Sequence, residues 1–219
     1  INDSQIENTV NEKLLGVEFD QSLNWPLHTD SMCKKISQRL GTLQRTRHFL
    51  PLNARLSFYR WLILSVMDYC GVVWGNTSQQ NLDRFLKLQK RAATLILDAD
   101  KRAPSLSLFL KLRWLPIQDR IKYFRCLLVH KSLHGLAPSY VSDLMLPFSH
   151  VHNRYTRSAV NNSLKLPKVN NNSGKRTFAF MAATDSLDIE LRSSSSLPQF
   201  RRAYLKMAFT KLAQLLLKV

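Results

Sequence analysis

Residues 79–97 read QQNLDRFLKLQKRAATLIL, and this stretch decides the fold class. On a helical wheel at 100° per residue, five apolar side chains fall within one arc: Leu82, Phe85, Leu86, Ala93 and Ile96. Three cations cluster on the opposite side: Arg84, Lys87 and Arg91. The stretch therefore predicts a helix that packs on one face and carries positive charge on the other.

The segments before it predict two more helices. In 30–48 the apolar side chains recur at three- and four-residue steps and form one stripe: Met32, Ile36, Leu40 and Leu43. A second helix follows Pro51, with Asn53 as its cap, and ends near Tyr69. Because that helix is apolar nearly all round, we expect it to be the central helix of a bundle.

The segments after it are also mostly helical. Helices are expected at 104–113, 116–134 and 139–145, and a last amphipathic helix from 197 to 218. The expected packed side of that last helix consists of Phe200, Tyr204, Met207, Leu212 and Leu215.

Strands are expected at the N-terminus and, sparsely, near the C-terminus. Ile6–Val10 and residues 13–19 are rich in β-forming residues and predict a hairpin. Two strands alone are marginal in water, so we expect this pair to belong to a larger upstream sheet. Residues 177–182 predict another strand, and short strands are expected at 154–158 and 164–166.

The charge of the chain is strongly positive and unevenly distributed. The 219 residues contain 32 Lys and Arg against 15 Asp and Glu, a formal net charge of +17. Residues 1–30 hold six acids and one base, which leaves 31 bases and nine acids for residues 31–219. A surplus of this size repels itself unless a polyanion neutralises it, so nucleic acid is the expected partner.

The candidate contacts lie on two helices and in the basic, Asn-rich stretch 147–176. Solvated helix faces normally carry both signs of charge, whereas beyond residue 31 these two helices hold only one acid, Asp83. We therefore interpret the cations as phosphate ligands, which position a nucleic acid without reading its sequence. Tyr155 is the candidate for base stacking. The candidate residues are Lys34, Lys35, Arg39, Arg45, Arg47, Arg84, Lys87, Lys90, Arg91, Arg154, Tyr155 and Arg157.

Residues suited to catalysis or metal binding are sparse. Asp98 and Asp100 form a close acidic pair, which we interpret as solvated acids neutralised by Lys101 and Arg102. His130 and His134 have the spacing of two ligands on one helix, but further ligands are missing nearby. We interpret both as surface histidines and expect no metal, cofactor or independent catalysis in this chain.

The cysteines and the apolar runs favour an intracellular protein. Cys33, Cys70 and Cys126 are far apart and odd in number, which argues for buried thiols in a reducing compartment, the nucleus or the cytoplasm. The apolar run from Trp61 to Trp74 is too short to span a bilayer, so we expect no membrane contact. We also expect no secretion, because the chain starts Ile-Asn-Asp without a signal peptide, as a fragment would.

Taken in order, these segments resemble the region that follows the palm in reverse transcriptases of non-LTR retrotransposons, the LINE elements of the CR1, L2 and jockey type. The matching blocks, by residue number, are KLLGVEFD at 13–20 with Leu23, Asn24 and Trp25; KKIS at 34–37; LGTL at 40–43; YCG at 69–71; VWG at 73–75; LQKRA at 88–92; LPI at 115–117 with Arg120; Lys131, Gly135, Pro138 and Tyr140; YTRS at 155–158; and Phe200. The blocks keep a shared order across nearly the whole chain.

The resemblance implies a mainly α fold: a helical, thumb-like bundle with a short N-terminal β-hairpin and a smaller mixed C-terminal part. The predicted division is a hairpin and linker at 1–29, a helical domain at 30–146, a basic loop or linker at 147–176, and a strand plus amphipathic helix at 177–219. The resemblance identifies the first part as a residual palm edge and the second as thumb-like. The implied partners are RNA and DNA, as a template–primer duplex, and the palm and fingers of the same polyprotein.

The resemblance also places the chemistry outside this chain. The family's catalytic acids, and the Mg²⁺ that they hold, belong to an aromatic-Ala-Asp-Asp motif upstream, which this sequence lacks. Residues 184–189 read TDSLDI where family members commonly show Trp-Asn followed by Leu-Pro, so the tail departs from the pattern. Two other hypotheses are a host-adopted or relic helical interaction protein with a basic surface, and a free-standing enzyme that uses Asp98 or Asp100.

Overall fold

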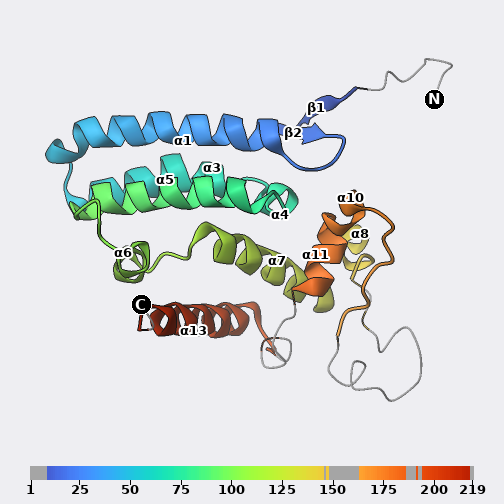
Figure 1. The fold of residues 1–219 in the computed structure, drawn as a ribbon. Helices are drawn as coiled ribbons and strands as arrows, with labels where there is room; N and C mark the ends of the chain where they lie inside the picture. The colour runs from blue at the N-terminus through green and yellow to red at the C-terminus, as the bar shows by residue number, and fades with distance from the viewer. Residues whose placement is uncertain (1–8, 146, 148–162, 186–190, 192–193, 218–219) are drawn as a thin grey trace.

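The computed structural model describes residues 9–145, 147, 163–185, 191 and 194–217. In chain order the elements are β1 (Asn11–Leu14), β2 (Val17–Asp20), α1 (Pro26–Thr46), the 3₁₀ turn η1 (Arg47–Phe49), α2 (Leu52–Phe58), the π-helical η2 (Tyr59–Leu64), α3 (Ser65–Asp68), α4 (Gly71–Trp74), α5 (Gln79–Leu97), α6 (Ser105–Leu112), α7 (Ile117–Leu133), α8 (Ser139–Ser142), α10 (Asn172–Lys175), α11 (Phe178–Thr184) and α13 (Leu197–Leu216). The predicted fold class is confirmed: the chain is mainly helical and has a short antiparallel hairpin near its N-terminus (Figure 1).

The hairpin lies within a shorter stretch than the sequence predicted. Asn11 pairs with Asp20 and Leu14 pairs with Val17, so both strands lie within residues 11–20 and the single strand predicted at 13–19 is wrong, because it contains the turn. Residues 9 and 10, the described part of the strand predicted at Ile6–Val10, are not in a strand. The reason is the two-residue turn, in which Leu15 and Gly16 both have positive φ, 48° and 80°. A tight turn of this kind fixes the register of the strands on either side of it.

The first layer of the bundle consists of α1 and α5, which lie side by side and run in the same direction (Figure 1). Their facing stripes are fully buried: Ile36, Leu40 and Leu43 from α1, and Phe85, Ala92 and Ile96 from α5. The apolar periodicity of both sequences therefore predicts the packed faces correctly.

The segment α2–η2–α3 packs against one side of this layer. It begins at Leu52 with Pro51, not Asn53, as its N-cap, and its stripe Tyr59, Ile63 and Met67 is buried. The prediction that it is the central helix of the bundle is wrong, because Trp61 is 72% exposed and Leu62 is 42% exposed. The described part of the chain covers this segment on one face only.

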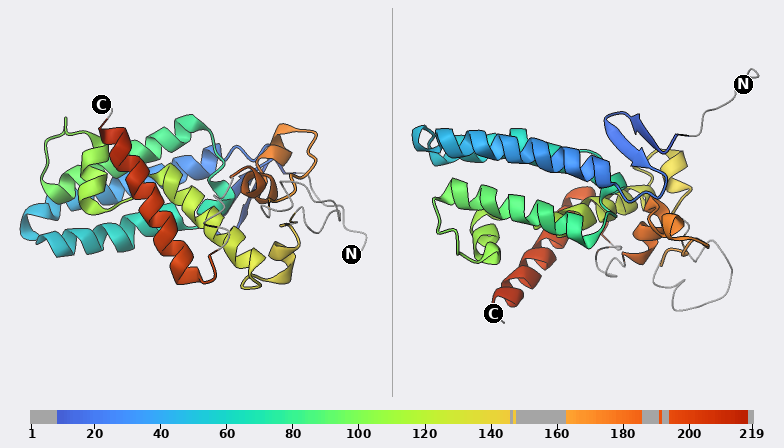
Figure 2. Two further views of the ribbon diagram at one scale, coloured as in Figure 1. Left: turned by 90° about the horizontal axis from the view of Figure 1, so that it is seen from below. Right: turned by 45° about the horizontal axis from the view of Figure 1, so that its top comes forward.

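The second layer consists of α6, α7 and α13, with α13 lying across α6 and α7 (Figure 2). A separate apolar cluster joins α7 to α13 through Cys126, Phe200 and Tyr204. Met207 and Leu215, which were predicted for the packed side of α13, are substantially exposed.

Of the three strands predicted for the C-terminal region, one is a helix, one forms a single bridge and one lies outside the described residues. The strand predicted at 177–182 is wrong, since Phe178–Thr184 forms the helix α11, which packs on α7 with Ala182 buried. Three alanines in seven residues favour a helix once tertiary packing covers one side. At 164–166 the only pairing in the described residues is a bridge from Leu164 to Pro147, and 154–158 lies outside them.

Every helix in the described ranges is too short or too polar to cross a bilayer.

Candidate nucleic-acid interface

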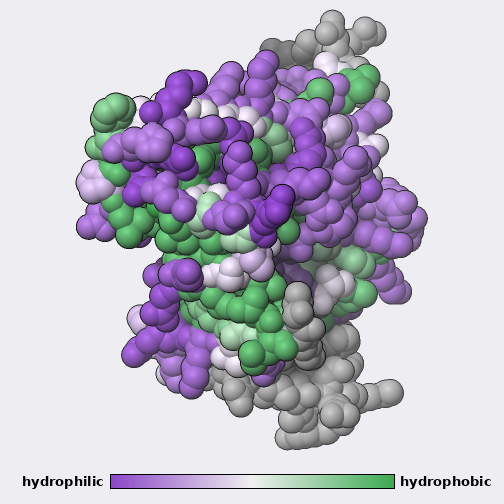
Figure 3. Space-filling view, turned by 60° about the vertical axis from the view of Figure 1, so that its left-hand side comes forward, coloured by the Kyte–Doolittle hydropathy of each residue, from purple (hydrophilic) through white to green (hydrophobic). Residues whose placement is uncertain are grey.

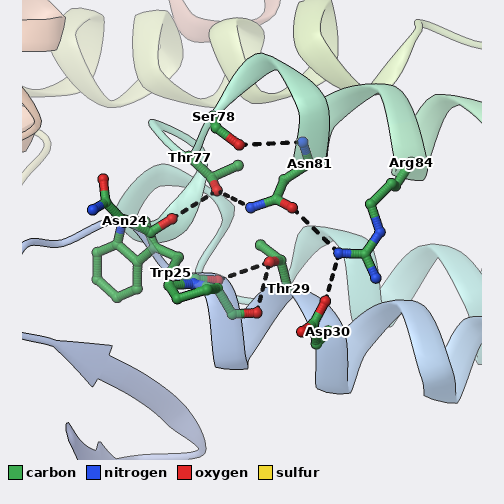
Figure 4. A network of polar contacts seen from close by, with 9 residues as sticks. Asn24, Trp25, Thr29, Asp30, Thr77, Ser78, Asn81 and Arg84 are labelled. Carbon is green, nitrogen blue, oxygen red and sulfur yellow. Dashed lines mark hydrogen bonds and ion pairs between the residues drawn. The ribbon is translucent and has the colours of Figure 1, made fainter.

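The loops that precede α1 and α5 are joined to each other by side-chain hydrogen bonds (Figure 4). Trp25 donates from Nε1 to Oδ1 of Asn76 at 2.6 Å, and the Thr77 hydroxyl donates to the carbonyl of Asn24 at 2.9 Å. The carboxylate of Asp20 accepts the backbone N–H of Trp25 and holds the loop in place. These contacts hold the N-terminal ends of α1 and α5 side by side.

The same network continues outward to a cation (Figure 4). Asn81 donates to the Thr77 hydroxyl at 2.9 Å, and its amide oxygen accepts from Arg84 at 3.3 Å. Arg84 also forms an ion pair with Asp30 of α1 at 2.5 Å. The position of Arg84 is therefore set by contacts within the chain.

The far ends of the two helices are joined by a shared carboxylate. Asp98 lies 2.5 Å from Arg55 and 3.3 Å from Arg47, and the hydrogen bond from Arg55 lowers the pKa of the Asp98 carboxyl. The prediction that Asp98 is neutralised by Lys101 and Arg102 is therefore wrong. The true partners lie more than 40 positions away in the chain.

Five of the predicted cations share the exposed face where α1 and α5 meet. Lys34 and Arg45 are exposed on the outward side of α1, as the helical wheel predicted. Arg84 and Arg91 lie along the facing edge of α5, where Arg91 donates to the side chain of Gln44 at 2.8 Å. Lys87 is exposed one turn from both arginines.

Three cations of this face form no ion pair within the described residues. Within those ranges, no carboxylate lies within 4 Å of Lys34, Arg45 or Lys87. The acid Asp30 lies in α1, but Arg84 neutralises it. The exposed acid Asp83 lies one turn before Lys87, so the face formed by the described residues is predominantly, but not wholly, positive.

The remaining predicted residues lie elsewhere. Lys35 and Arg39 are on the other edge of α1, Arg47 is held by Asp98, and Lys90 is half-buried on the side of α5 away from α1. Arg154, Tyr155 and Arg157 lie outside the described residues. The described members of the predicted set therefore lie on two edges of α1 and on α5.

The second edge is a groove that the sequence did not reveal. Lys35 and Arg39 line a hollow of about 450 Å³ between the hairpin, α1 and η2, together with the exposed aromatics Trp61 and Tyr69. Arg39 donates a hydrogen bond to the backbone carbonyl of Leu62. The sequence could have predicted that Trp61 is exposed, because it lies 200° around the helix from Tyr59 and therefore off the apolar stripe.

The two histidines of α7 are in different environments. His130 is buried, its Nε2 lies 3.0 Å from the carbonyl of Ser194, and burial lowers its pKa. The prediction of a surface histidine is therefore wrong for His130 and correct for His134, which is exposed and stacks on it. Within the part of the chain that the structure describes, no three His, Cys, Asp or Glu residues are grouped to hold a metal ion.

The fold and this surface define a helical protein with a predominantly cationic face where α1 and α5 meet. No family model, curated protein or solved structure matches the chain.

Proposed function

We propose that the chain is the post-palm, C-terminal part of a non-LTR retrotransposon reverse transcriptase, and that it holds a template–primer duplex without performing chemistry of its own. The observation that carries the proposal is the face where Lys34, Arg45 and Lys87 form no ion pair within the described residues. Such cations displace counterions from a phosphate backbone, which gives sequence-independent binding. The proposed location of the protein is the nucleus or the cytoplasm, where RNA and DNA partners are present.

The sequence blocks that carry the resemblance support the proposal through their contacts. Gln89 of the LQKRA block donates to the carbonyl of Leu115 at 2.8 Å and accepts the N–H of Ile117 at 3.0 Å, and these two residues belong to the LPI block. At Gly75 of the VWG block, a Cβ would lie 2.3 Å from the carbonyl oxygen of Gly71 and 2.4 Å from Ile121. The blocks therefore have roles in one shared fold, as expected if the order of blocks reflects common architecture.

The groove on the other side of α1 adds a second kind of contact. Trp61 presents its ring to solvent beside Lys35 and Arg39. An aromatic ring next to cations suits an unpaired or terminal base, whose π-face stacks while its phosphate is neutralised. In the proposed role, the α1–α5 face holds the backbone and the groove holds a base at the end of the duplex.

A salt titration tests the proposal. Binding of the chain to a fluorescent RNA–DNA duplex of about 20 base pairs should weaken linearly in log affinity against log salt, with a slope of about −3 to −5 if three to five phosphates are neutralised. Absence of binding at low salt would contradict the proposal. Equally tight binding of polyglutamate would favour the helical interaction protein with a basic surface.

The family assignment has its own test. The proposal expects the DNA immediately upstream of this coding segment to encode the aromatic-Ala-Asp-Asp motif, whose carboxylates would hold Mg²⁺. An open reading frame with that motif supports the assignment to a reverse transcriptase. Interrupting stop codons would make the chain a relic, and an unrelated open domain would contradict the assignment.

A further inference from the structure

A second hollow lies between α13 and the corner where α6 gives way to α7. It has a volume of about 730 Å³, and its apolar lining comes from Leu115 and Tyr123 on one side and from Leu205 and Phe209 of α13 on the other. On the face that carries α6 and the C-terminal end of α13, apolar surface forms a band between two polar zones (Figure 3). This hollow is separate from the cationic face of α1 and α5.

The walls of the hollow are held in place by packing. Leu115 is buried, and Tyr123 packs against Tyr204 with ring centroids 5.2 Å apart. Arg113 ends α6 in the left-handed conformation, with φ of 53°, and its backbone N–H is fixed by the carbonyl of Leu110. The hollow is therefore part of the folded state and needs no rearrangement to accept a ligand.

The charged residues that line the hollow all have the same sign. Arg113, Arg202 and Lys206 are exposed, and within the described ranges no carboxylate lies within 4 Å of them. Arg120 also lines the hollow, but Asp68 neutralises it. Three unbalanced cations thus accompany an aromatic and aliphatic floor.

We propose that this hollow binds one nucleotide of a single-stranded nucleic acid, with the base against the apolar floor and the phosphate against the cations. The volume lies within the range of about 300–1,000 Å³ that is usual for small-molecule sites. Guanidinium groups match the geometry of a phosphate, and aromatic rings accept any base by stacking. A fatty acid would leave most of the positive charge unmatched, and an acidic peptide would leave the apolar floor unfilled.

A titration of the full chain with three small probes tests this site without the duplex. Binding is followed by NMR chemical shifts. AMP should bind about tenfold more tightly than adenosine, which lacks the phosphate, or ribose 5-phosphate, which lacks the base. Equal affinity of ribose 5-phosphate and AMP would reduce the site to general anion binding and overturn the proposal. Equal affinity of adenosine and AMP would overturn the role of the cations.

Variants localise the effect. Phe209→Leu and Arg202→Gln should each weaken AMP about tenfold, while Met207→Ala and Lys211→Gln, on the same helix but outside the lining, should leave AMP binding unchanged. Circular dichroism checks that each variant is folded. Because these positions are remote from the α1–α5 face, duplex binding should persist in all four, so failure of this site and failure of the proposed function are distinguishable. AMP binding that is insensitive to both lining substitutions would overturn the proposal.

Discussion

Arg120 and Asp68 form a two-point ion pair, with Nε 2.5 Å from Oδ1 and Nη2 2.6 Å from Oδ2. The pair joins α7 to the end of α3, and the guanidinium also lies over the ring of Phe124 at 5.1 Å. The two side chains are only 25% and 28% exposed, so water screens the pair less than it screens an ordinary surface pair. This contact fixes the second layer of the bundle to the first.

Removal of one partner should therefore destabilise the fold. We expect Asp68→Asn to lower the free energy of unfolding by about 1–3 kcal/mol, because Arg120 would keep its charge in a half-buried position. Asp30→Asn is the matched control, since its ion pair with Arg84 is mostly exposed and should contribute at most about 1 kcal/mol. Urea unfolding followed by circular dichroism measures both. Equal losses would contradict the structural role given to the Arg120–Asp68 pair.

Gln89 should be the most sensitive polar residue of α5. Its side chain is fully buried and satisfies the carbonyl of Leu115 and the N–H of Ile117. Gln89→Leu fits the apolar surroundings but leaves both backbone groups unpaired, so we expect a loss of about 2 kcal/mol or more. The exposed Gln79 of the same helix is the control, and Gln79→Leu should change stability by less than about 0.5 kcal/mol. Thermal unfolding compares the two variants, and a neutral Gln89→Leu would show that this polar contact is dispensable.

The stability of the fold should depend on pH through His28. Burial lowers the pKa of His28 in the folded chain, although the carboxylate of Glu18 opposes this shift. Its Nδ1 accepts the backbone N–H of Glu18, which requires the neutral ring. Because the unfolded chain then binds the proton more readily, stability is present above the ordinary pKa of about 6.5 and is lost as pH falls through the lowered value.

The variant His28→Asn isolates this effect, because an amide oxygen can accept the same N–H without titrating. Between pH 7 and pH 5, urea unfolding should show a smaller loss of stability for His28→Asn than for the unmodified chain. A parallel pH dependence of the two proteins would contradict the assignment. His130 also has a lowered pKa, so the comparison must be made between proteins and not from one curve alone.

How much of the fold the sequence predicts depends on whether a segment packs on one face. The helices α1, α5 and α13 follow from their apolar periodicity, because a regular stripe can only be buried if the chain coils at 3.6 residues per turn. The segment that forms α11 was assigned wrongly, because FAFMAAT is apolar without a period and only its contact with α7 selects the helix. The hairpin register depended on Leu15 adopting a positive φ, which its residue type disfavours.

The candidate site was predicted in part for a similar reason. The outward positions of Lys34 and Arg45 follow from the helical wheel alone. The pairing of Arg84 with Asp30 depends on contacts between segments far apart in the chain, and one sequence does not contain that information. The groove beside Trp61 also depends on how the hairpin packs against η2, and this placed it beyond the reach of sequence reasoning.

Trp61 should contribute to binding and not to stability. Because its ring is mostly exposed, we expect Trp61→Ala to change the free energy of unfolding by less than about 0.5 kcal/mol. Loss of a stacking partner should weaken binding of a short single-stranded oligonucleotide by about 1–3 kcal/mol, and Trp61→Phe should restore most of it. Fluorescence anisotropy measures the affinities. Unchanged affinity in Trp61→Ala would exclude the groove from the interface.

Two charge-matched triple variants test whether the face formed by α1 and α5 binds the duplex. One replaces Lys34, Arg45 and Lys87 with Gln, and the other replaces the exposed Lys101, Lys111 and Lys175, which lie off the α1–α5 face. Duplex affinity is measured against salt concentration for both. We expect the first variant to lose about two to three units of the slope of log affinity against log salt, while the second keeps the original slope to within about one unit. Equal loss of slope in both variants would show diffuse attraction to a positive chain and would contradict a binding face formed by α1 and α5.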